Sequence, residues 1–158
     1  LRTVSPPLRA AYSEVILEFA QHERKTFEEE AKSTDPFHQR RARLMLKAYD
    51  EGKPERSITY PVQGLRFGND LTLVAFGGEV VVDYALRLKR EFPRENLVVA
   101  GYSNDVMGYI PSQRVLKEGG YEPVDSMIYY GHPGPFSEKV ENTVIGAAHQ
   151  VLRKLGVR

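Results

Sequence analysis

The chain has 158 residues, of which 41% are hydrophobic and 27% charged, values typical of a single globular domain with a buried core. Its formal net charge of +1 argues against a nucleic-acid-binding protein, which needs a concentrated positive surface. No apolar run reaches the ~18 residues of a membrane span. The sequence has no cysteine, so any metal would be bound by His, Asp, Glu or Tyr.

The first third of the chain is expected to form one strand and two helices. Residues 11–19 alternate apolar and polar side chains, which predicts a strand. The highly charged residues 21–33 predict an exposed helix. Asp35 followed by proline is typical of a helix start, and Gly52-Lys53-Pro54 ends the helix that begins there.

A β-hairpin and a strand–helix–strand pattern follow. Residues 57–67 and 71–76 are β-rich and are joined by Gly-Asn-Asp, which predicts a hairpin. Residues 80–92 have the apolar spacing of an amphipathic helix, with Val81, Tyr84, Ala85, Leu88 and Phe92 inward. Residues 97–101 form a short buried-type strand.

The last part of the chain is expected to be helical. Residues 112–118 predict a short helix closed by two glycines, and Ser137 is expected to cap a final helix. That helix turns Val140, Val144, Ala147, Ala148, Val151, Leu152 and Leu155 inward. Alternating strands and helices predict an α/β fold with a small mixed sheet and flanking helices. We expect residues 1–158 to be one such domain, and the start at Leu1, without an initiator methionine, suggests a fragment of a longer protein.

Glu79 is the first residue whose position suggests chemistry. It follows two glycines at a predicted strand–helix junction, where glycines permit a sharp turn and leave room for a close approach. A carboxylate in the first turn of a helix is also favoured by the helix dipole. The alternative interpretation is that Glu79 only caps its helix.

Tyr109 is a second candidate, in a loop that also contains Gly101, Asn104 and Gly108. A tyrosine in such a loop is usually a packing or hydrogen-bonding residue. Its phenol binds a metal as the phenolate, which forms only when a cation is adjacent. His132 lies in a Tyr/Gly/Pro-rich segment that is suited to line a cleft. No His-x-x-x-His pair is present, so a self-contained zinc site is not expected. The sequence also has no nucleophile elbow and no P-loop.

Taken in order, these motifs resemble the carboxy-terminal part of the catalytic region of neutral/alkaline, non-lysosomal ceramidases. The resemblance rests on a strand ending in Gly-Gly-Glu79, then Asn104-x4-Tyr109-Ile, then Tyr121-Glu, and it covers residues 58–122. That family is zinc-dependent and hydrolyses the amide between a fatty acid and a sphingoid base.

The resemblance implies a role for each matching residue. Glu79 and Tyr109 would be two zinc ligands, Tyr121 would lie near the scissile amide as a second catalytic residue with Tyr109, and Asn104 would line the site. The other two ligands, both histidines, and a catalytic serine would come from the rest of the catalytic domain upstream of Leu1. The isolated chain would then contain only half of the active site and would be inactive by itself. The resemblance also implies a secreted or extracytoplasmic location.

The chain departs from the family pattern at several positions. Val80-Val81-Val82 stands where family members tend to have Phe-Thr-Thr, and Ser112 after Pro111 replaces a threonine. These differences imply a divergent bacterial-type member acting on a lipid-like amide that need not be ceramide.

Two other functions fit parts of the sequence. One is a non-enzymatic α/β interaction module that contacts its partner through residues 129–135. A weaker one is a phosphate-binding module that uses Arg40, Arg41 and Arg43. A solvated helix face is the simpler interpretation of the three arginines.

Overall fold

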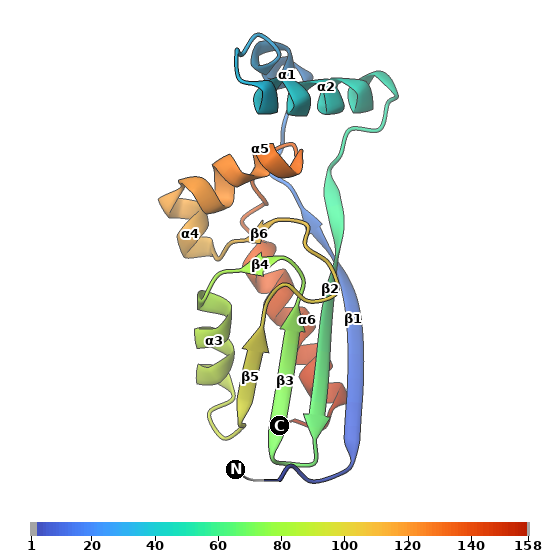
Figure 1. The fold of residues 1–158 in the computed structure, drawn as a ribbon, viewed down its shortest axis with the longest axis vertical. Helices are drawn as coiled ribbons and strands as arrows, with labels where there is room; N and C mark the ends of the chain where they lie inside the picture. The colour runs from blue at the N-terminus through green and yellow to red at the C-terminus, as the bar shows by residue number, and fades with distance from the viewer. Residues whose placement is uncertain (1–2, 158) are drawn as a thin grey trace.

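A four-stranded mixed sheet organises the fold, which the computed structural model describes for residues 3–157 (Figure 1). The strand order is β1-β2-β3-β5. Strands β1 (Leu8–Glu18), β2 (Ser57–Phe67) and β3 (Leu71–Phe76) are antiparallel neighbours, and β5 (Leu97–Ala100) pairs with β3 in parallel. The predicted α/β class with a small mixed sheet and flanking helices is confirmed.

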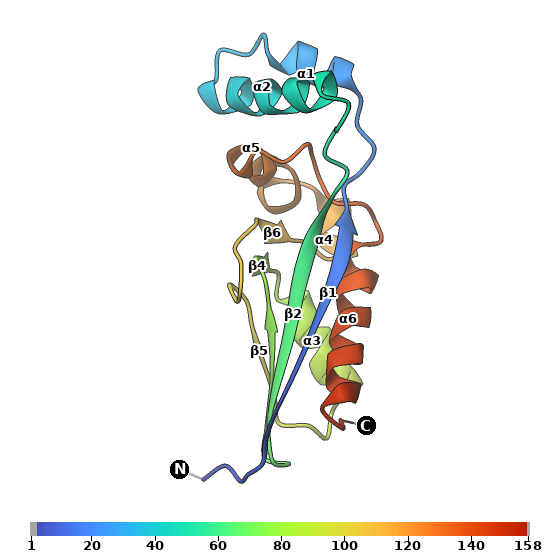
Figure 2. The same ribbon diagram turned by 90° about the vertical axis from the view of Figure 1, so that its right-hand side faces the viewer.

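The inner face of the sheet is covered by two helices, α3 (Asp83–Glu91) and α6 (Val140–Lys154), which lie on the same side of the sheet (Figure 2). The Cβ that an alanine would add at Gly64 would lie 2.5 Å from Cγ1 of Val151, so glycine lets α6 approach β2 closely. The core between these layers includes Leu17, Tyr60, Val62, Val74, Phe76, Tyr84, Leu88, Val144, Ala148, Val151 and Leu152. The predicted inward residues of the final helix are all buried.

The outer face of the sheet is not covered by any helix of residues 3–157 (Figure 2). The strand register places Leu8 beside Phe67 and Phe67 beside Leu71, so apolar side chains form rows across this face. On the edge strand, Tyr12 and Ile16 are 47% and 55% exposed. The apolar members of the outer face are Leu8, Tyr12, Ile16, Leu65, Phe67, Leu71, Leu73 and Val98.

A helical hairpin connects β1 to β2 and projects beyond the end of the sheet (Figure 1). It consists of α1 (Arg24–Glu30) and α2 (Pro36–Asp50), and its own small core is formed by Phe27, Ala42 and Met45. The predicted start of α2 is confirmed, because the Asp35 carboxylate accepts hydrogen bonds from the first free backbone N–H groups.

The arginines of α2 do not form an anion site. Both Nε and Nη2 of Arg41 donate to the Glu30 carboxylate, which is 8% exposed, and Arg40 donates to the carbonyl oxygen of Tyr129. The cluster is therefore neither a convergent phosphate site nor a fully solvated face, because Arg41 instead joins the two helices of the hairpin.

Two predicted helix starts are wrong, and both errors have the same cause. α3 begins at Asp83 because Glu79 and Val80 form a short strand, β4, paired with β6 (Tyr109–Ile110). α6 begins at Val140, and Ser137 does not cap it. The backbone N–H of Ser137 donates to Glu18 at the end of β1, which holds this segment extended. In both places, pairing with a distant strand overrides the local helix signal.

Three other elements lie around the end of the sheet. α4 (Gln113–Glu118) has the predicted bounds within one residue, and its Ser112 cap accepts from the backbone N–H of Val115. A π-helical turn, η1 (Tyr121–Asp125), and α5 (Ser126–Tyr130) follow directly. These last two were not expected from the sequence, which indicated a loop over residues 129–135.

Candidate functional site

The candidate site is built on the parallel pair β4–β6, beyond the carboxyl ends of β3 and β5 (Figure 1). Glu79 is the direct partner of Tyr109, and its backbone N–H donates to the carbonyl oxygen of Gly108 at 2.8 Å. Paired residues of a ladder direct their side chains to the same face. The Tyr109 hydroxyl donates a hydrogen bond to the Glu79 carboxylate.

The two glycines before Glu79 form the turn that makes this pairing possible. Gly78 has φ of +63°, and a Cβ there would lie 2.6 Å from the carbonyl oxygen of Gly108. Its N–H donates to Asp105 and its carbonyl accepts from Tyr102, both at 2.8 Å. The predicted reasons for glycine, a sharp turn and a close approach, both apply here.

Glu79 is not a helix cap. It lies in β4, four residues before the start of α3, whose N-cap residue is Val82. The helix-dipole argument for its charge therefore does not hold. Glu79 is instead positioned by the ladder with Tyr109.

Tyr102 is a functional candidate that the sequence analysis missed. Its hydroxyl donates to Glu79, so this one carboxylate accepts from two phenols. Tyr102 has φ of 53°, an uncommon conformation for a tyrosine, and its side chain is 59% exposed. The signal that points to it is its place just after β5, because β3 and β5 are parallel and end at the same sheet edge.

The carboxylate raises the pKa of both phenols. Hydrogen bonding to Glu79 is the main cause for Tyr102 and for Tyr109, and it raises the pKa of each to about 12. Partial desolvation and repulsion between the carboxylate and a phenolate act in the same direction. Without a cation, both phenols are therefore neutral donors at pH 7.

Tyr121, the predicted third member of the site, lies beside Tyr109. It begins η1, and its ring centroid is 5.8 Å from that of Tyr109 in an edge-to-face arrangement. Its side chain is 51% exposed. The structure therefore brings Glu79, Tyr109 and Tyr121 together, although they come from three different segments.

Asn104 and His132 lie at the site's supporting loop and do not touch Glu79. Asn104 is exposed in the left-handed region at φ of 68°, a conformation that asparagine tolerates. The His132 ring contacts the carbonyl oxygen of Met107 through Nε2 at 2.8 Å, and its Nδ1 lies 3.6 Å from Glu55. His132 thus contacts the backbone of the segment just before Tyr109 and helps to fix its position.

A pocket of about 430 Å³ opens beside Glu79 and Tyr109. Glu118 and Glu122 add two further carboxylates to its wall, against one guanidinium from Arg114. The pocket therefore has an excess of negative charge, which favours a cation. Its remaining lining residues are Val80, Val81, Val82, Val115 and Gly119, so the three valines that depart from the family pattern face the candidate site.

The oxygen donors fit part of a zinc site. A carboxylate and a phenol are suitable hard ligands, and they face each other across one ladder position. A tetrahedral zinc site with one open position needs three protein ligands or more. Within residues 3–157, no three His, Cys, Asp or Glu side chains are grouped to hold a metal.

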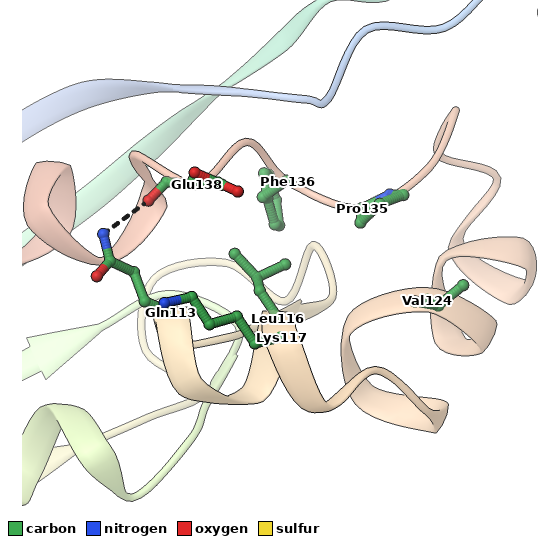
Figure 3. A pocket seen from close by; sticks show the side chains of 7 residues that line it. All are labelled: Gln113, Leu116, Lys117, Val124, Pro135, Phe136 and Glu138. Atoms are coloured by element: carbon green, nitrogen blue, oxygen red, sulfur yellow. Dashed lines mark hydrogen bonds between the residues drawn. The ribbon is translucent and has the colours of Figure 1, made fainter.

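A second pocket, of about 290 Å³, lies on the other side of α4 (Figure 3). Leu116 and Phe136 face each other across it, and the Gln113 side chain donates to the carbonyl oxygen of Glu138 at 3.1 Å. Its other lining residues are Lys117, Val124 and Pro135. It does not include Glu79 or any of the tyrosines of the candidate site.

Comparison with protein-family models, with curated proteins and with solved structures finds no match to this chain. Among the helices of residues 3–157, none has the length and apolar character to cross a lipid bilayer.

Proposed function

We propose that this chain carries half of a zinc-dependent amidase site, similar to that of neutral ceramidases, that hydrolyses a lipid-like N-acyl amide. The observation that carries the proposal is the hydrogen bond between Tyr109 and Glu79 across β4 and β6. Two oxygen donors from segments thirty positions apart meet at one point beside a pocket with excess negative charge. A structure with the two side chains on opposite sides of the sheet would have removed the basis for this function.

Glu79 and Tyr109 would hold the zinc ion, together with histidines from outside this chain. When bound, zinc supplies a Lewis acid that polarises the amide carbonyl. In the absence of metal, the phenols of Tyr109 and Tyr102 both donate hydrogen bonds to the Glu79 carboxylate. Tyr102 would keep this hydrogen bond and orient the carboxylate toward Tyr109.

Tyr121 is the candidate hydrogen-bond donor to the substrate. Its ring packs edge-to-face on Tyr109, and the residue is 51% exposed. A neutral phenol in this position donates to the oxyanion that develops when an amide carbonyl is attacked, a contribution of about 3 kcal/mol for one such donor in other enzymes. The ring contact with Tyr109 orients that donor.

The alternative, a non-enzymatic interaction module, is less well supported. It would be favoured by a surface without pockets and by a Tyr109 ring packed in the core. Tyr109 is half-buried and lines the pocket beside Glu79. A phosphate-binding module lacks support because Arg41 is paired with Glu30.

The test is the zinc content and N-acyl amide hydrolysis of the full-length protein, for wild type and for Glu79→Gln and Tyr109→Phe. The chain offers a matched control, because Tyr12 donates to Glu14 at 2.9 Å on the outer face of the sheet. Tyr12→Phe and Glu14→Gln remove the same chemical groups at a site with no predicted metal.

We expect stoichiometric zinc in wild type, with zinc and hydrolysis both reduced by at least about tenfold in the two site variants and unchanged in the controls. A folded full-length protein without zinc, in which the site variants behave like the controls, would reject the proposed function.

A further inference from the structure

A row of four aromatic rings leads away from the candidate site. From Tyr109 to Tyr121 the ring centroids are 5.8 Å apart, from Tyr121 to Tyr129 they are 6.4 Å apart, and from Tyr129 to Phe37 they are 4.9 Å apart. The four rings come from β6, η1, α5 and α2. The row therefore joins the chemical site to the helical hairpin at the end of the molecule.

The outer three rings of this aromatic row are open to solvent. Tyr121, Tyr129 and Phe37 are 51%, 50% and 47% exposed. Leu44 is 43% exposed on the same helix as Phe37. These residues are not isolated apolar side chains on the surface, because each ring contacts the next ring along the row.

The hairpin is held in the orientation that aligns Phe37 with the row. Arg40 donates to the carbonyl oxygen of Tyr129 at 3.1 Å, and Leu44 packs against Gly131 at the end of α5. The hairpin core of Phe27, Ala42 and Met45 does not depend on this contact. Docking on α5 is thus a separate feature that adds an aromatic and an aliphatic side chain to the row.

The chemistry of the row fits an apolar chain. The Tyr121 and Tyr129 side chains make no hydrogen bond to other residues in the described part of the chain, and Phe37 has no polar group. The outer three rings of the row thus offer mainly flat apolar contact through their faces, with the Tyr121 and Tyr129 hydroxyls as their only polar side-chain groups. Methylene groups need only such contact, whereas a carbohydrate needs directed hydrogen bonds to its hydroxyls.

We infer that the aromatic row of Tyr121, Tyr129 and Phe37 is the subsite for the extended apolar chain of a substrate whose polar end lies at Glu79 and Tyr109. This inference rests on the proposed function for the position of the polar end. The α1–α2 hairpin is then a substrate-binding element, and Phe37 contacts the part of the substrate's apolar chain that lies farthest from the reacting bond.

The experiment measures binding of two probes to the 158-residue chain by NMR of its aromatic ring signals. The probes are N-octanoylethanolamine, below its aggregation concentration, and N-acetylethanolamine, which has the same head group without the chain. The variants are Phe37→Ala and Phe37→Leu, with Tyr12→Ala as the control. Tyr12 is a comparably exposed aromatic residue on the outer face.

We expect the octanoyl probe to shift the ring signals of Tyr121, Tyr129 and Phe37 and to bind at least about tenfold more tightly than the acetyl probe. Phe37→Ala should weaken the octanoyl probe about fivefold and leave the acetyl probe unchanged. Phe37→Leu, which keeps an apolar side chain, should lose less, and Tyr12→Ala should lose nothing.

Several results would overturn the inference. They are equal affinity for the two probes, no binding of the octanoyl probe, signal shifts at the Leu116–Phe136 pocket, or weakening by Tyr12→Ala instead of Phe37→Ala. Because these measurements need neither zinc nor hydrolysis, they are separate from the test of the proposed function. Binding of the octanoyl probe as expected, together with a full-length protein that holds no zinc, would support the subsite and reject the amidase. Zinc and hydrolysis as expected, without binding of the octanoyl probe, would support the amidase and reject the subsite.

Discussion

Gly78 and Gly108 approach each other so closely that a Cβ on Gly78 would lie 2.6 Å from the carbonyl oxygen of Gly108. That oxygen accepts the backbone N–H of Glu79, which is the hydrogen bond that aligns Glu79 with Tyr109. The distance between two backbones therefore decides whether the two candidate ligands meet.

Gly78→Ala should destabilise the protein by about 2–4 kcal/mol, from the unfavourable positive φ and the contact with a backbone atom that cannot rotate away. Gly52→Ala is the matched control. Gly52 has a similar φ of +68°, but a Cβ there would meet nothing within 4 Å. Its cost should be only about 1 kcal/mol. Urea unfolding of both variants measures the difference, and equal costs would show that the close approach contributes nothing.

The Glu79 carboxylate should control the pKa of the two phenols that donate to it. Glu79→Gln removes the negative charge, so the pKa values of Tyr102 and Tyr109 should fall from about 12 toward the ordinary value near ~10. Ultraviolet difference absorbance of the metal-free chain at alkaline pH follows the ionisation. Tyr12→Phe provides a comparison, because it removes one phenol whose pKa is raised by a hydrogen bond to Glu14 and should leave the ionisation of Tyr102 and Tyr109 unchanged.

The same hydrogen bonds predict a loss of stability at high pH. A folded pKa above the unfolded value means that the folded state binds these protons more tightly. Their contribution is complete below a pH of about 10 and is lost as the pH rises toward 12. In Glu79→Gln, the decline over this range should be shallower. Identical pH–stability curves for both proteins would contradict the hydrogen bonds.

Asp83 should stabilise the contact between α3 and α4 above acidic pH. The hydrogen bond from Arg114, at 3.0 Å from Nη2, is the main cause that lowers the pKa of Asp83. Burial opposes it, and a hydrogen bond from Ser112 lowers the pKa further. A lowered folded pKa gives a contribution that is present above pH ~4 and lost as the pH falls. Asp83→Asn should cost about 1–2 kcal/mol at pH 7, with the difference disappearing near pH ~2.

Glu118→Gln is the control for this pH dependence. Glu118 also pairs with Arg114, but both side chains of that pair are 57% exposed, so the substitution should cost at most about 0.5 kcal/mol. Thermal unfolding between acidic and neutral pH measures both variants. A cost for Asp83→Asn that does not change with pH would contradict a titrating carboxylate at this position.

Adjacent residues of β1 should respond very differently to substitution. Leu17 is 1% exposed against α6, whereas Ile16 is 55% exposed on the outer face. Leu17→Ala should cost about 2–5 kcal/mol, and Ile16→Thr should stay within about 0.5 kcal/mol of wild type. Ile16→Thr should also bind less of an apolar dye such as anilinonaphthalene sulfonate. A large loss of stability in Ile16→Thr would mean that the outer face is covered.

Much of the fold was predictable because its signals are local. The turn between β2 and β3, the Asp35 cap of α2 and the Ser112 cap of α4 each depend on residues within a few positions of one another. The buried face of α6 follows from helical periodicity alone. Strand alternation predicts β1 in the same way, although it begins three residues earlier than expected.

The errors arose where distant segments compete with a local preference. Val80 would fit the helix that follows it, but it pairs with Ile110 in β4–β6 instead. Ser137 has the chemistry of a helix cap, but its backbone is held by the end of β1. Tyr102 was missed because only the parallel alignment of β3 and β5 brings it to Glu79.

By itself, the amino-acid sequence determined the α/β class, most of the strands and helices, and the residue types from which a site could be built. Periodicity and capping are encoded within one or two turns of chain, so they need no knowledge of distant neighbours. Only the tertiary structure decided that the Glu79 carboxylate accepts hydrogen bonds from the hydroxyls of Tyr102 and Tyr109, and that Phe37 lies in one row with Tyr121 and Tyr129. These contacts join segments separated by tens of residues, and their geometry is set by strand register and by the docking of the α1–α2 hairpin on α5.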